Sequence, residues 1–206
     1  IEFDGKDITN EPPHKVGELG LARTFQLLRL YQDMSVINNV MSGYHTLVPY
    51  SFIDAVTGRK KIWDQEKVIK EEMMELLSFV GLADYAELNA SELSGGQRRL
   101  LVLARAIAGK PKLLMLDEPA AGLSPVNVDN LMKILLQLKE KYGLTLIIIE
   151  HILKVVMSTC NKVTVLDHGV KIAEGTPSQV KDDKNVIEAY LGKKMDDEEM
   201  RKALAV

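Results

Sequence analysis

Two short apolar runs, separated by an amphipathic segment, constrain the fold of this chain most strongly. The runs are Leu113–Leu116 and Leu146–Ile149, and wholly apolar stretches of this length are typical of strands buried on both faces of a sheet. Between them, Ser124 and Pro125 open a predicted helix, with proline at the first helical position, and Gly143 closes it. The apolar face of that helix comprises Val128, Leu131, Leu135 and Leu138. This alternation of strand and helix predicts an α/β fold with a mostly parallel sheet covered by helices.

Further elements are predicted on both sides of this unit. Ser94 is a good N-cap for a helix that Gly109 ends, with Leu100, Leu103, Ala104 and Ile107 on one face. Before this helix, the sequence predicts a hairpin or edge strand over 1–8 with a turn at Asp4-Gly5, and a strand-like segment ending at Thr24-Phe25-Gln26. A loop is predicted over 49–58, followed by a helix over 64–79 that Gly81 ends. A hairpin is predicted over 163–173 around His168-Gly169. The charged tail over 193–206 is expected to fray.

Composition excludes several classes of function. The chain has 206 residues, a formal net charge of -3 and a pI of about 5.9, so no basic surface for nucleic acid is expected. Its one cysteine, Cys160, cannot form an internal disulfide, which fits a reducing cytosol. The opening residues carry no signal-peptide pattern, and no apolar run approaches the length of a bilayer span. We therefore expect any role at a membrane to come through a partner.

The segment Leu93-Ser94-Gly95-Gly96-Gln97 is a candidate phosphate site. Its two glycines allow a ligand to approach the backbone closely, and the helix that follows presents free N–H groups and a positive dipole end. Taken alone, the segment is equally well explained as a loop followed by an N-cap.

Two acidic residues follow the first apolar run. Asp117 and Glu118 end this strand, so they are predicted at the carboxyl edge of the sheet, where ligands of open α/β folds bind. One carboxylate could hold Mg²⁺, and the other could orient an attacking water molecule. The second strand leads to Glu150-His151, where the histidine could donate to a phosphate. The alternative is a pair of strand ends that meet solvent.

Together, in this order, these motifs resemble the ATPase domain of ABC transporters over nearly the whole chain. Leu93–Gln97 resembles the family signature, Leu113–Glu118 its Walker B strand, His151 its switch histidine and Gln26 its Q-loop glutamine. The resemblance implies ATP and Mg²⁺ as ligands. It also implies roles for individual residues. Asp117 and Gln26 would hold Mg²⁺, Glu118 would polarise the hydrolytic water, and His151 would contact the γ-phosphate. Gln26 would also link the site to the membrane subunit, and the nucleotide held by the opposite subunit would be bound by Ser94, Gly95, Gly96 and Gln97.

A finer resemblance points to the ATPase subunits of branched-chain amino-acid importers. It rests on Arg23–Gln26, Val36–Val40, Glu118–Leu123 and the ending Ile187–Gly192. The ATPase of lipopolysaccharide export is a similar relative with a similar ending. In either system, Ser124 stands where many family members carry an aspartate, so the usual carboxylate link across the ATPase dimer is not implied here.

No P-loop occurs in the chain. A P-loop requires G-x-x-x-x-G-K-[ST], but Gly5-Lys6, Gly109-Lys110 and Gly192-Lys193 are followed by Asp7, Pro111 and Lys194. The resemblance places the P-loop, and the aromatic residue that stacks on adenine, upstream of Ile1. We therefore expect that the first part of the core is missing, that apolar faces near the Asp117 strand are uncovered, and that this chain alone does not hydrolyse ATP.

These observations predict a single ABC ATPase domain over 1–206. Its expected parts are a helical subdomain at about 36–109, a segment from the Walker B strand to the switch region at about 110–160, and a C-terminal hairpin with helices at about 161–206. The implied partners are transmembrane permease subunits, a second ATPase subunit and, indirectly, a periplasmic or extracellular binding protein. The implied location is the cytoplasmic face of the membrane.

The surface between Val36 and Glu92 is expected to dock the permease, with Tyr44, Tyr50, Phe52 and Trp63 as candidate anchors. Two alternatives to a transport ATPase remain at this point. One is a non-catalytic docking module, and the other is a soluble ABC ATPase without a transporter.

Overall fold

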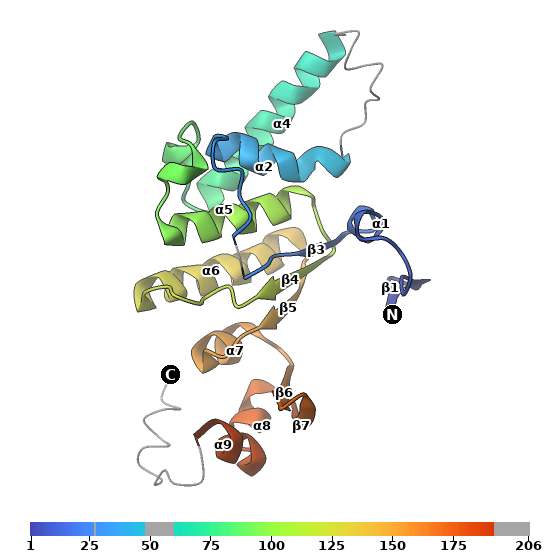
Figure 1. Cartoon of the computed structure of the whole chain (residues 1–206), viewed down its shortest axis with the longest axis vertical. Coiled ribbons are helices and arrows are strands. Elements are labelled where there is room, and N and C mark those ends of the chain that lie inside the picture. The colour runs from blue at the N-terminus through green and yellow to red at the C-terminus, as the bar shows by residue number, and fades with distance from the viewer. Residues whose placement is uncertain (27, 48–59, 192–206) are drawn as a thin grey trace. The chain divides into compact units, whose positions relative to one another are not determined.

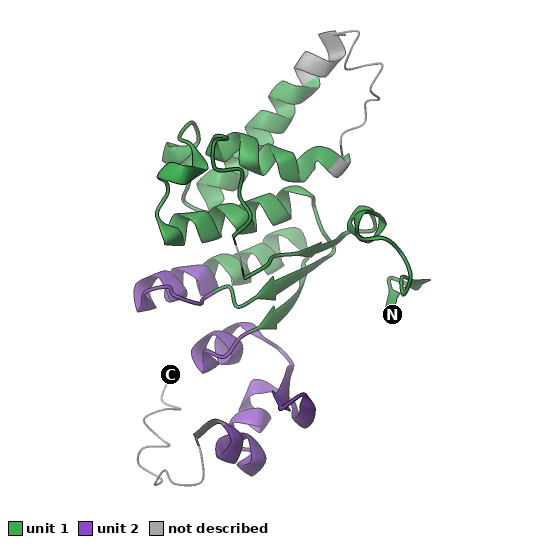
Figure 2. Cartoon of the chain, viewed as in Figure 1, with its two compact units in different colours: residues 1–119, 133–149 green, residues 120–132, 150–206 purple. Residues whose placement is uncertain are grey.

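The computed structural model describes residues 1–26, 28–47 and 60–191. Contacts between Cα atoms divide the chain into two compact units (Figure 2). Unit 1 comprises residues 1–119 and 133–149, and unit 2 comprises residues 120–132 and 150–206. The predicted loop over 49–58 and the predicted fraying of the tail lie outside the described residues. The predicted subdomain boundaries stay predictions.

Unit 1 contains the predicted parallel sheet. Its described strands are β3 (Leu21–Arg23), β4 (Leu113–Asp117) and β5 (Thr145–Ile149), in the order β3-β4-β5, and both pairings are parallel. β4 is therefore the middle strand, and its Leu114 and Leu116 are buried. The α/β class predicted from the two apolar runs is confirmed.

The prediction that both runs are buried on both faces is wrong for β5. Ile147 and Ile149 are 48% and 59% exposed. These two residues are two positions apart and therefore lie on the same face of β5, and that face is uncovered, as was expected for apolar faces near the Asp117 strand. An apolar run therefore identified the strand correctly but did not determine how much of it is covered here.

β3 ends slightly earlier than expected. The strand stops at Arg23, although the N–H of Thr24 still donates to the carbonyl oxygen of Met115 at 2.9 Å. From Phe25 onward the backbone leaves the sheet. The short N-terminal hairpin was predicted correctly, with β1 (Glu2–Phe3) antiparallel to β2 (Lys6–Asp7).

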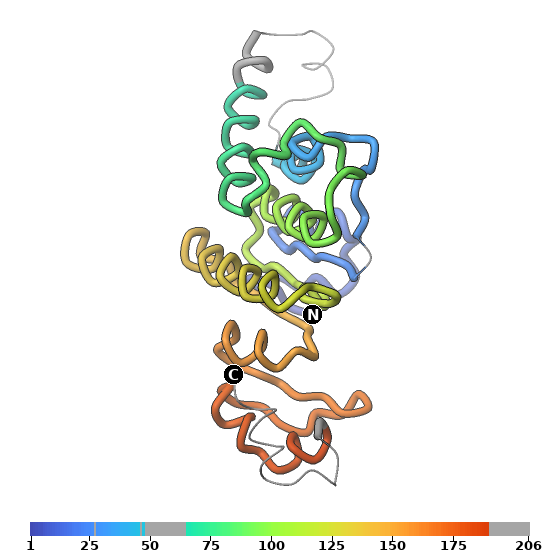
Figure 3. The backbone as a smooth tube through the Cα atoms, turned by 90° about the vertical axis from the view of Figure 1, so that its left-hand side faces the viewer, coloured from blue at the N-terminus to red at the C-terminus, as the bar shows by residue number. Residues whose placement is uncertain are grey.

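The helices of unit 1 are α1 (Pro13–Glu18), α2 (Val36–Tyr44), α4 (Lys60–Phe79) and α5 (Gly95–Ala108), with short 3-10 turns at His45–Leu47, Ala83–Tyr85 and Ala90–Glu92. Of the helices of unit 1, α2, α4 and α5 pack against one another above the sheet in the view of Figure 1, whereas α1 contacts β3. α2 runs alongside α5 in Figures 1 and 3. On α5, Leu101, Leu103, Ala104 and Ile107 are buried, while the predicted face residue Leu100 is half-buried.

Unit 2 has a small core of its own. It contains α7 (Leu153–Thr159), β6 (Val163–Asp167), β7 (Val170–Gly175), α8 (Pro177–Lys181) and α9 (Lys184–Leu191). β6 and β7 form the predicted antiparallel hairpin, and His168 and Gly169 both have positive φ in its turn. The buried residues of this unit are Val163, Val165, Ala173, Val180 and Val186. One further helix, α6 (Pro125–Tyr142), has residues in both units.

Candidate functional site

Two carboxylates stand where the middle strand of the sheet ends. Asp117 is the last residue of β4, and Glu118 follows it. The N–H of Glu118 donates to the carbonyl oxygen of Ile149 at 2.9 Å, which extends the pairing with β5 by one residue. Glu118 has a φ of 45°, a left-handed backbone conformation that is uncommon for residues other than glycine and that tends to occur at functional sites.

β3 and the segment that follows it supply a partner for each carboxylate. Nη2 of Arg23 donates to Oδ2 of Asp117 at 3.0 Å, and Nε2 of Gln26 donates to Oε2 of Glu118 at 2.9 Å. Because β3 and β4 are parallel neighbours, the residues that follow both strands meet at one edge of the sheet. The structure thus brings Gln26 to Glu118, the residue next to Asp117.

The predicted phosphate segment caps α5. Oγ of Ser94 accepts from the N–H of Gln97 at 3.4 Å, and Oε1 of Gln97 accepts from the N–H of Ser94 at 2.9 Å, which completes a capping box. A Cβ added at Gly95 would meet nothing within 4 Å, so the backbone there is open to approach. Further along the same helix, Nη1 of Arg99 donates to the carbonyl oxygen of Glu118 at 3.3 Å.

His151, the predicted switch histidine, lies at the start of the second segment of unit 2. The side chain of His151 is 63% exposed, whereas that of Glu150 is fully buried. Oε1 of Glu150 accepts from the N–H of Ala120 at 2.8 Å, and Oε2 accepts from the N–H groups of His151 and Ile152 at 3.1 and 3.2 Å. Glu150 therefore fixes the backbone on both sides of His151. Within the same unit, Oγ of Ser124 accepts from the N–H of Asn127 at 3.4 Å and caps the start of α6.

Sequence reasoning gave no role to Arg23 and Arg99, which bond to Asp117 and Glu118 in unit 1, or to Glu150, which fixes the backbone around His151 in unit 2. Arg23 had been noted only as part of a resemblance. An arginine at the end of a strand predicts an ion pair only when the neighbouring strand is known to end in an acidic residue. Glu150 had been noted beside His151, but nothing in the sequence distinguishes a buried capping carboxylate from an exposed one.

The donor set at the sheet edge fits a hard cation. No group of three or more His, Cys, Asp or Glu residues in the described part of the chain could hold a metal by itself. Asp117, Glu118 and Gln26 nevertheless offer carboxylate and amide oxygens, and Mg²⁺ characteristically takes one or two such ligands and completes its shell with water and phosphate oxygens.

None of the described helices combines the length and the apolarity that crossing a bilayer requires.

Comparisons with known proteins agree with this geometry. The profile of the family described as "ABC transporter" matches residues 1–121, and the profile described as "Branched-chain amino acid ATP-binding cassette transporter" matches residues 170–195. The branched-chain amino acid transport ATP-binding protein BraF of Pseudomonas aeruginosa is 36% identical over 93% of this chain and 75% of its own length. The LivG proteins of Archaeoglobus fulgidus and Escherichia coli are 37% and 33% identical, over 93% and 88% of this chain and 73% and 71% of their own lengths.

Solved structures lead to the same family. An ATP-binding cassette of an ABC transporter in its ADP conformation superimposes with a TM-score of 0.74 at 34% identity, over 93% of this chain and 76% of that chain. A nucleotide-free cassette from an ABC transporter gives a TM-score of 0.74 at 33% identity, over 93% and 76%. With the sheet-edge carboxylates, the capped glycine segment and these similarities in agreement, the chain belongs to the ATP-binding subunits of the ABC transporter family.

Proposed function

We propose that this protein is the ATP-hydrolysing subunit of an importer of branched-chain amino acids. Relatives named for branched-chain amino acid transport cover most of this chain, and the C-terminal match over residues 170–195 carries the same description. Those names favour amino-acid import over lipopolysaccharide export. They also argue against a soluble ABC ATPase without a transporter.

One observation carries the catalytic part of the proposal. Gln26 and Glu118 are hydrogen-bonded at 2.9 Å beside Asp117, so a glutamine and two carboxylates converge where two parallel strands end. In this proposal Asp117 and Gln26 hold Mg²⁺, which would neutralise charge on the phosphates of bound ATP. Glu118 accepts a hydrogen bond from the attacking water and orients it toward the γ-phosphate.

The remaining site residues have proposed roles at the phosphates. His151 donates a hydrogen bond to the γ-phosphate, and its backbone is fixed for this by the buried carboxylate of Glu150. The segment Ser94–Gln97 binds the γ-phosphate of ATP held by a second ATPase subunit. The capping box leaves the first N–H groups of α5, at Gly95 and Gly96, without an intrahelical acceptor, and such groups suit an anion.

The proposed partners are transmembrane permease subunits and a second ATPase subunit, with a periplasmic or extracellular binding protein acting indirectly. The proposed location is the cytoplasmic face of the membrane. The permease contact was predicted between Val36 and Glu92. Of the candidate anchors there, Tyr44 is half-buried, with Nζ of Lys110 at 5.3 Å from the centre of its ring. Tyr50, Phe52 and the side chain of Trp63 lie outside the described residues.

Transport by the assembled system, reconstituted in vesicles, tests the proposal. We expect uptake of labelled leucine, isoleucine or valine to require ATP and the cognate binding protein, and to disappear when Glu118 is replaced by glutamine. The matched control is Glu140→Gln, at an exposed glutamate on α6, which should leave uptake unchanged. ATP-dependent transport of another class of substrate, with no response to branched-chain amino acids, would refute the substrate assignment while leaving the ATPase assignment in place.

A further inference from the structure

The backbone of Glu118 is held in an unfavourable conformation. Its φ of 45° is left-handed, and the residue that follows it is Pro119. A residue that precedes proline normally takes an extended backbone with a negative φ, because the proline ring crowds the other conformations. A conformation of this kind persists only when the surrounding structure holds it from several sides. The contacts of Glu118 therefore show which elements fix the direction of its carboxylate.

Three elements of unit 1 hold Glu118. The N–H of Glu118 donates to the carbonyl oxygen of Ile149 at the end of β5, and Nε2 of Gln26 donates to its carboxylate, both at 2.9 Å. The third contact comes from α5, where Nη1 of Arg99 donates to the carbonyl oxygen of Glu118 at 3.3 Å. The N–H, the side chain and the carbonyl group of this residue are thus each bound by a different part of the fold.

Arg99 is the positively charged member of this set. Its side chain is half-buried, and it forms no ion pair with a carboxylate of the described residues, so its hydrogen bond goes to the Glu118 carbonyl instead. A hydrogen bond from a charged donor contributes more than one between two neutral groups. Without this bond, Glu118 could relax toward the negative φ that a following proline favours. That rotation would turn its carboxylate away from Gln26.

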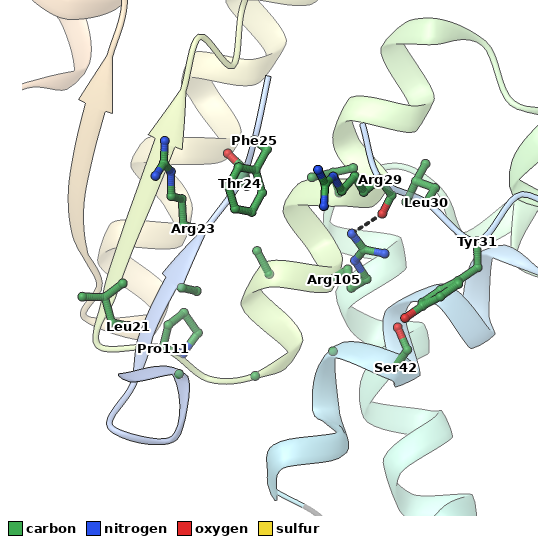
Figure 4. Close-up of a pocket in the computed structure, with 16 residues that line it drawn as sticks. Leu21, Arg23, Thr24, Phe25, Arg29, Leu30, Tyr31, Ser42, Arg105 and Pro111 are labelled. Atoms are coloured by element: carbon green, nitrogen blue, oxygen red, sulfur yellow. Dashed lines mark hydrogen bonds between the residues drawn. The ribbon is translucent and has the colours of Figure 1, made fainter. Parts of the chain in front are cut away.

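The same helix also holds the segment that carries Gln26. Six residues beyond Arg99, Nη2 of Arg105 donates to the carbonyl oxygen of Arg29. Figure 4 shows the side chain of Arg105 pointing toward that backbone, beside a cavity of about 600 Å³ that the segment after β3 lines. Two arginines of α5 therefore bind the main chain at Glu118 and three residues after Gln26, close to both partners of the hydrogen bond between them.

We propose that Arg99 is a positioning residue for ATP hydrolysis, which keeps Glu118 in its left-handed conformation and so aims the carboxylate at the attacking water. This inference rests on the proposed function, since it takes Glu118 as the water-orienting carboxylate. It gives α5 a second role beside that of its N-terminus. The residues Ser94–Gln97 are proposed to bind ATP held by a second subunit, whereas Arg99 acts on the hydrolytic carboxylate of its own chain.

Hydrolysis by the assembled transporter tests this role with two substitutions of one residue. Arg99→Met keeps a long side chain but removes the donor, whereas Arg99→Lys keeps a charged donor. We expect Arg99→Met to lower the rate at saturating ATP by about tenfold to a hundredfold, as for other displaced catalytic groups, with the KM for ATP within about twofold of wild type. Arg99→Lys should recover a large part of the lost rate. The matched control, Lys133→Met, removes an exposed charge on α6 and should leave the rate unchanged.

ATP affinity distinguishes positioning of Glu118 from a general defect of α5. When Arg99→Met is combined with Glu118→Gln, the ATP affinity of the transporter should stay within about twofold of that of Glu118→Gln alone, because only the hydrolytic step depends on the bond to Glu118. The hydrolysis rate of the double variant should equal that of Glu118→Gln, because Arg99 acts through this one side chain. A distorted α5 would instead weaken ATP binding on the same background.

The outcomes separate this inference from the proposed function. A wild-type hydrolysis rate for Arg99→Met, while Glu118→Gln is inactive, refutes the positioning role and leaves the proposed function intact. An equal loss of rate in Arg99→Met and Arg99→Lys, or an ATP affinity that falls with Arg99→Met, assigns Arg99 to the stability of α5 and also refutes the positioning role. Near wild-type hydrolysis by Glu118→Gln refutes the catalytic assignment in the proposed function, and this inference with it.

Discussion

Nε2 of Gln26 donates a hydrogen bond of 2.9 Å to Oε2 of Glu118, across two segments that are 92 residues apart in the sequence. The glutamine lies three residues after the end of β3, and the glutamate is the proposed water-orienting carboxylate. A change in the position of the backbone at Gln26 would therefore move the amide group that donates to the carboxylate of Glu118. In the proposed function, this hydrogen bond would couple movement of the segment after β3 to ATP hydrolysis.

Replacement of Glu118 by glutamine should abolish turnover and preserve ATP binding in the assembled transporter. Glutamine keeps the shape of the side chain and an oxygen that can accept from Gln26, but it lacks the negative charge that orients the water. We expect the hydrolysis rate to fall by about two orders of magnitude or more, with nucleotide affinity within a few-fold of wild type. Rate and affinity should be measured on the same preparation. Hydrolysis at a near wild-type rate would show that Glu118 is not the catalytic carboxylate.

Replacement of Arg23 by glutamine should make Mg²⁺ binding at the nucleotide site easier. The guanidinium of Arg23 occupies Oδ2 of Asp117 at 3.0 Å, and the same carboxylate is the proposed ligand of Mg²⁺. Because the pair is partly exposed, its net strength is modest, so the Mg²⁺ concentration for half-maximal nucleotide binding should fall by no more than about fivefold. A titration with Mg²⁺ at fixed ATP measures this effect. A higher Mg²⁺ requirement would mean that Arg23 supports the site and does not compete for it.

Local signals explain which features could be predicted from the sequence. The N-cap at Ser94 depends on one residue before the helix, and the turn at His168-Gly169 needs two adjacent residues with positive φ. The strands β4 and β5 follow from short apolar runs with helix signals between them. Each of these inferences depends on a few neighbouring residues, and the structure contains each element.

Features that depend on strand order could not be predicted in the same way. The pair of Arg23 and Asp117 exists only because β3 lies directly beside β4, and the sequence does not state which strands are neighbours. Arg105 occupies a helical position that periodicity describes as polar, and its place in a cavity depends on how α5 meets the backbone of Arg29.

Acid should weaken the β6–β7 hairpin through Glu174. Hydrogen bonds from Lys162 and then Lys171 lower the pKa of this carboxyl to about 2, from an ordinary value of 4.5. Since the folded pKa is the lower one, the stabilisation is fully present above about pH 4.5 and is lost as the pH falls through about 2. An NMR titration of the Glu174 carboxyl carbon should show the low midpoint, and Lys162→Gln should raise it. A midpoint near 4.5 in the wild-type protein would contradict the ion pairs.

Replacement of Gly43 by alanine should destabilise unit 1. A Cβ at this position would lie 2.0 Å from the carbonyl oxygen of Arg105, so α2 and α5 would have to separate. We expect the free energy of unfolding to fall by about 2 kcal/mol or more, as in other overpacked contacts. Gly17→Ala is the control, because a Cβ there meets nothing within 4 Å and should change stability by less than about 0.5 kcal/mol. Equal denaturation midpoints for the two variants would argue against the close helix contact.

Replacement of Glu150 should damage both stability and turnover. Its buried carboxylate accepts hydrogen bonds from the N–H groups of Ala120, His151 and Ile152, and alanine would leave all three donors without this acceptor. We expect Glu150→Ala to lower the free energy of unfolding by about 3 kcal/mol, and Glu150→Gln to cost less because one oxygen remains. Glu140→Ala, at an exposed position of α6, should cost less than about 0.5 kcal/mol.

The turnover of these variants distinguishes a structural role from a positioning role of Glu150. If Glu150 holds His151 in place, hydrolysis by Glu150→Gln should fall well below wild type at a temperature where the variant is still fully folded, because the backbone of the histidine is then less constrained. His151→Ala should show a similar loss of hydrolysis rate. The double variant should hydrolyse ATP only slightly more slowly than either single variant, because the losses caused by residues that act as a unit do not add. Additive losses would show that Glu150 and His151 act independently.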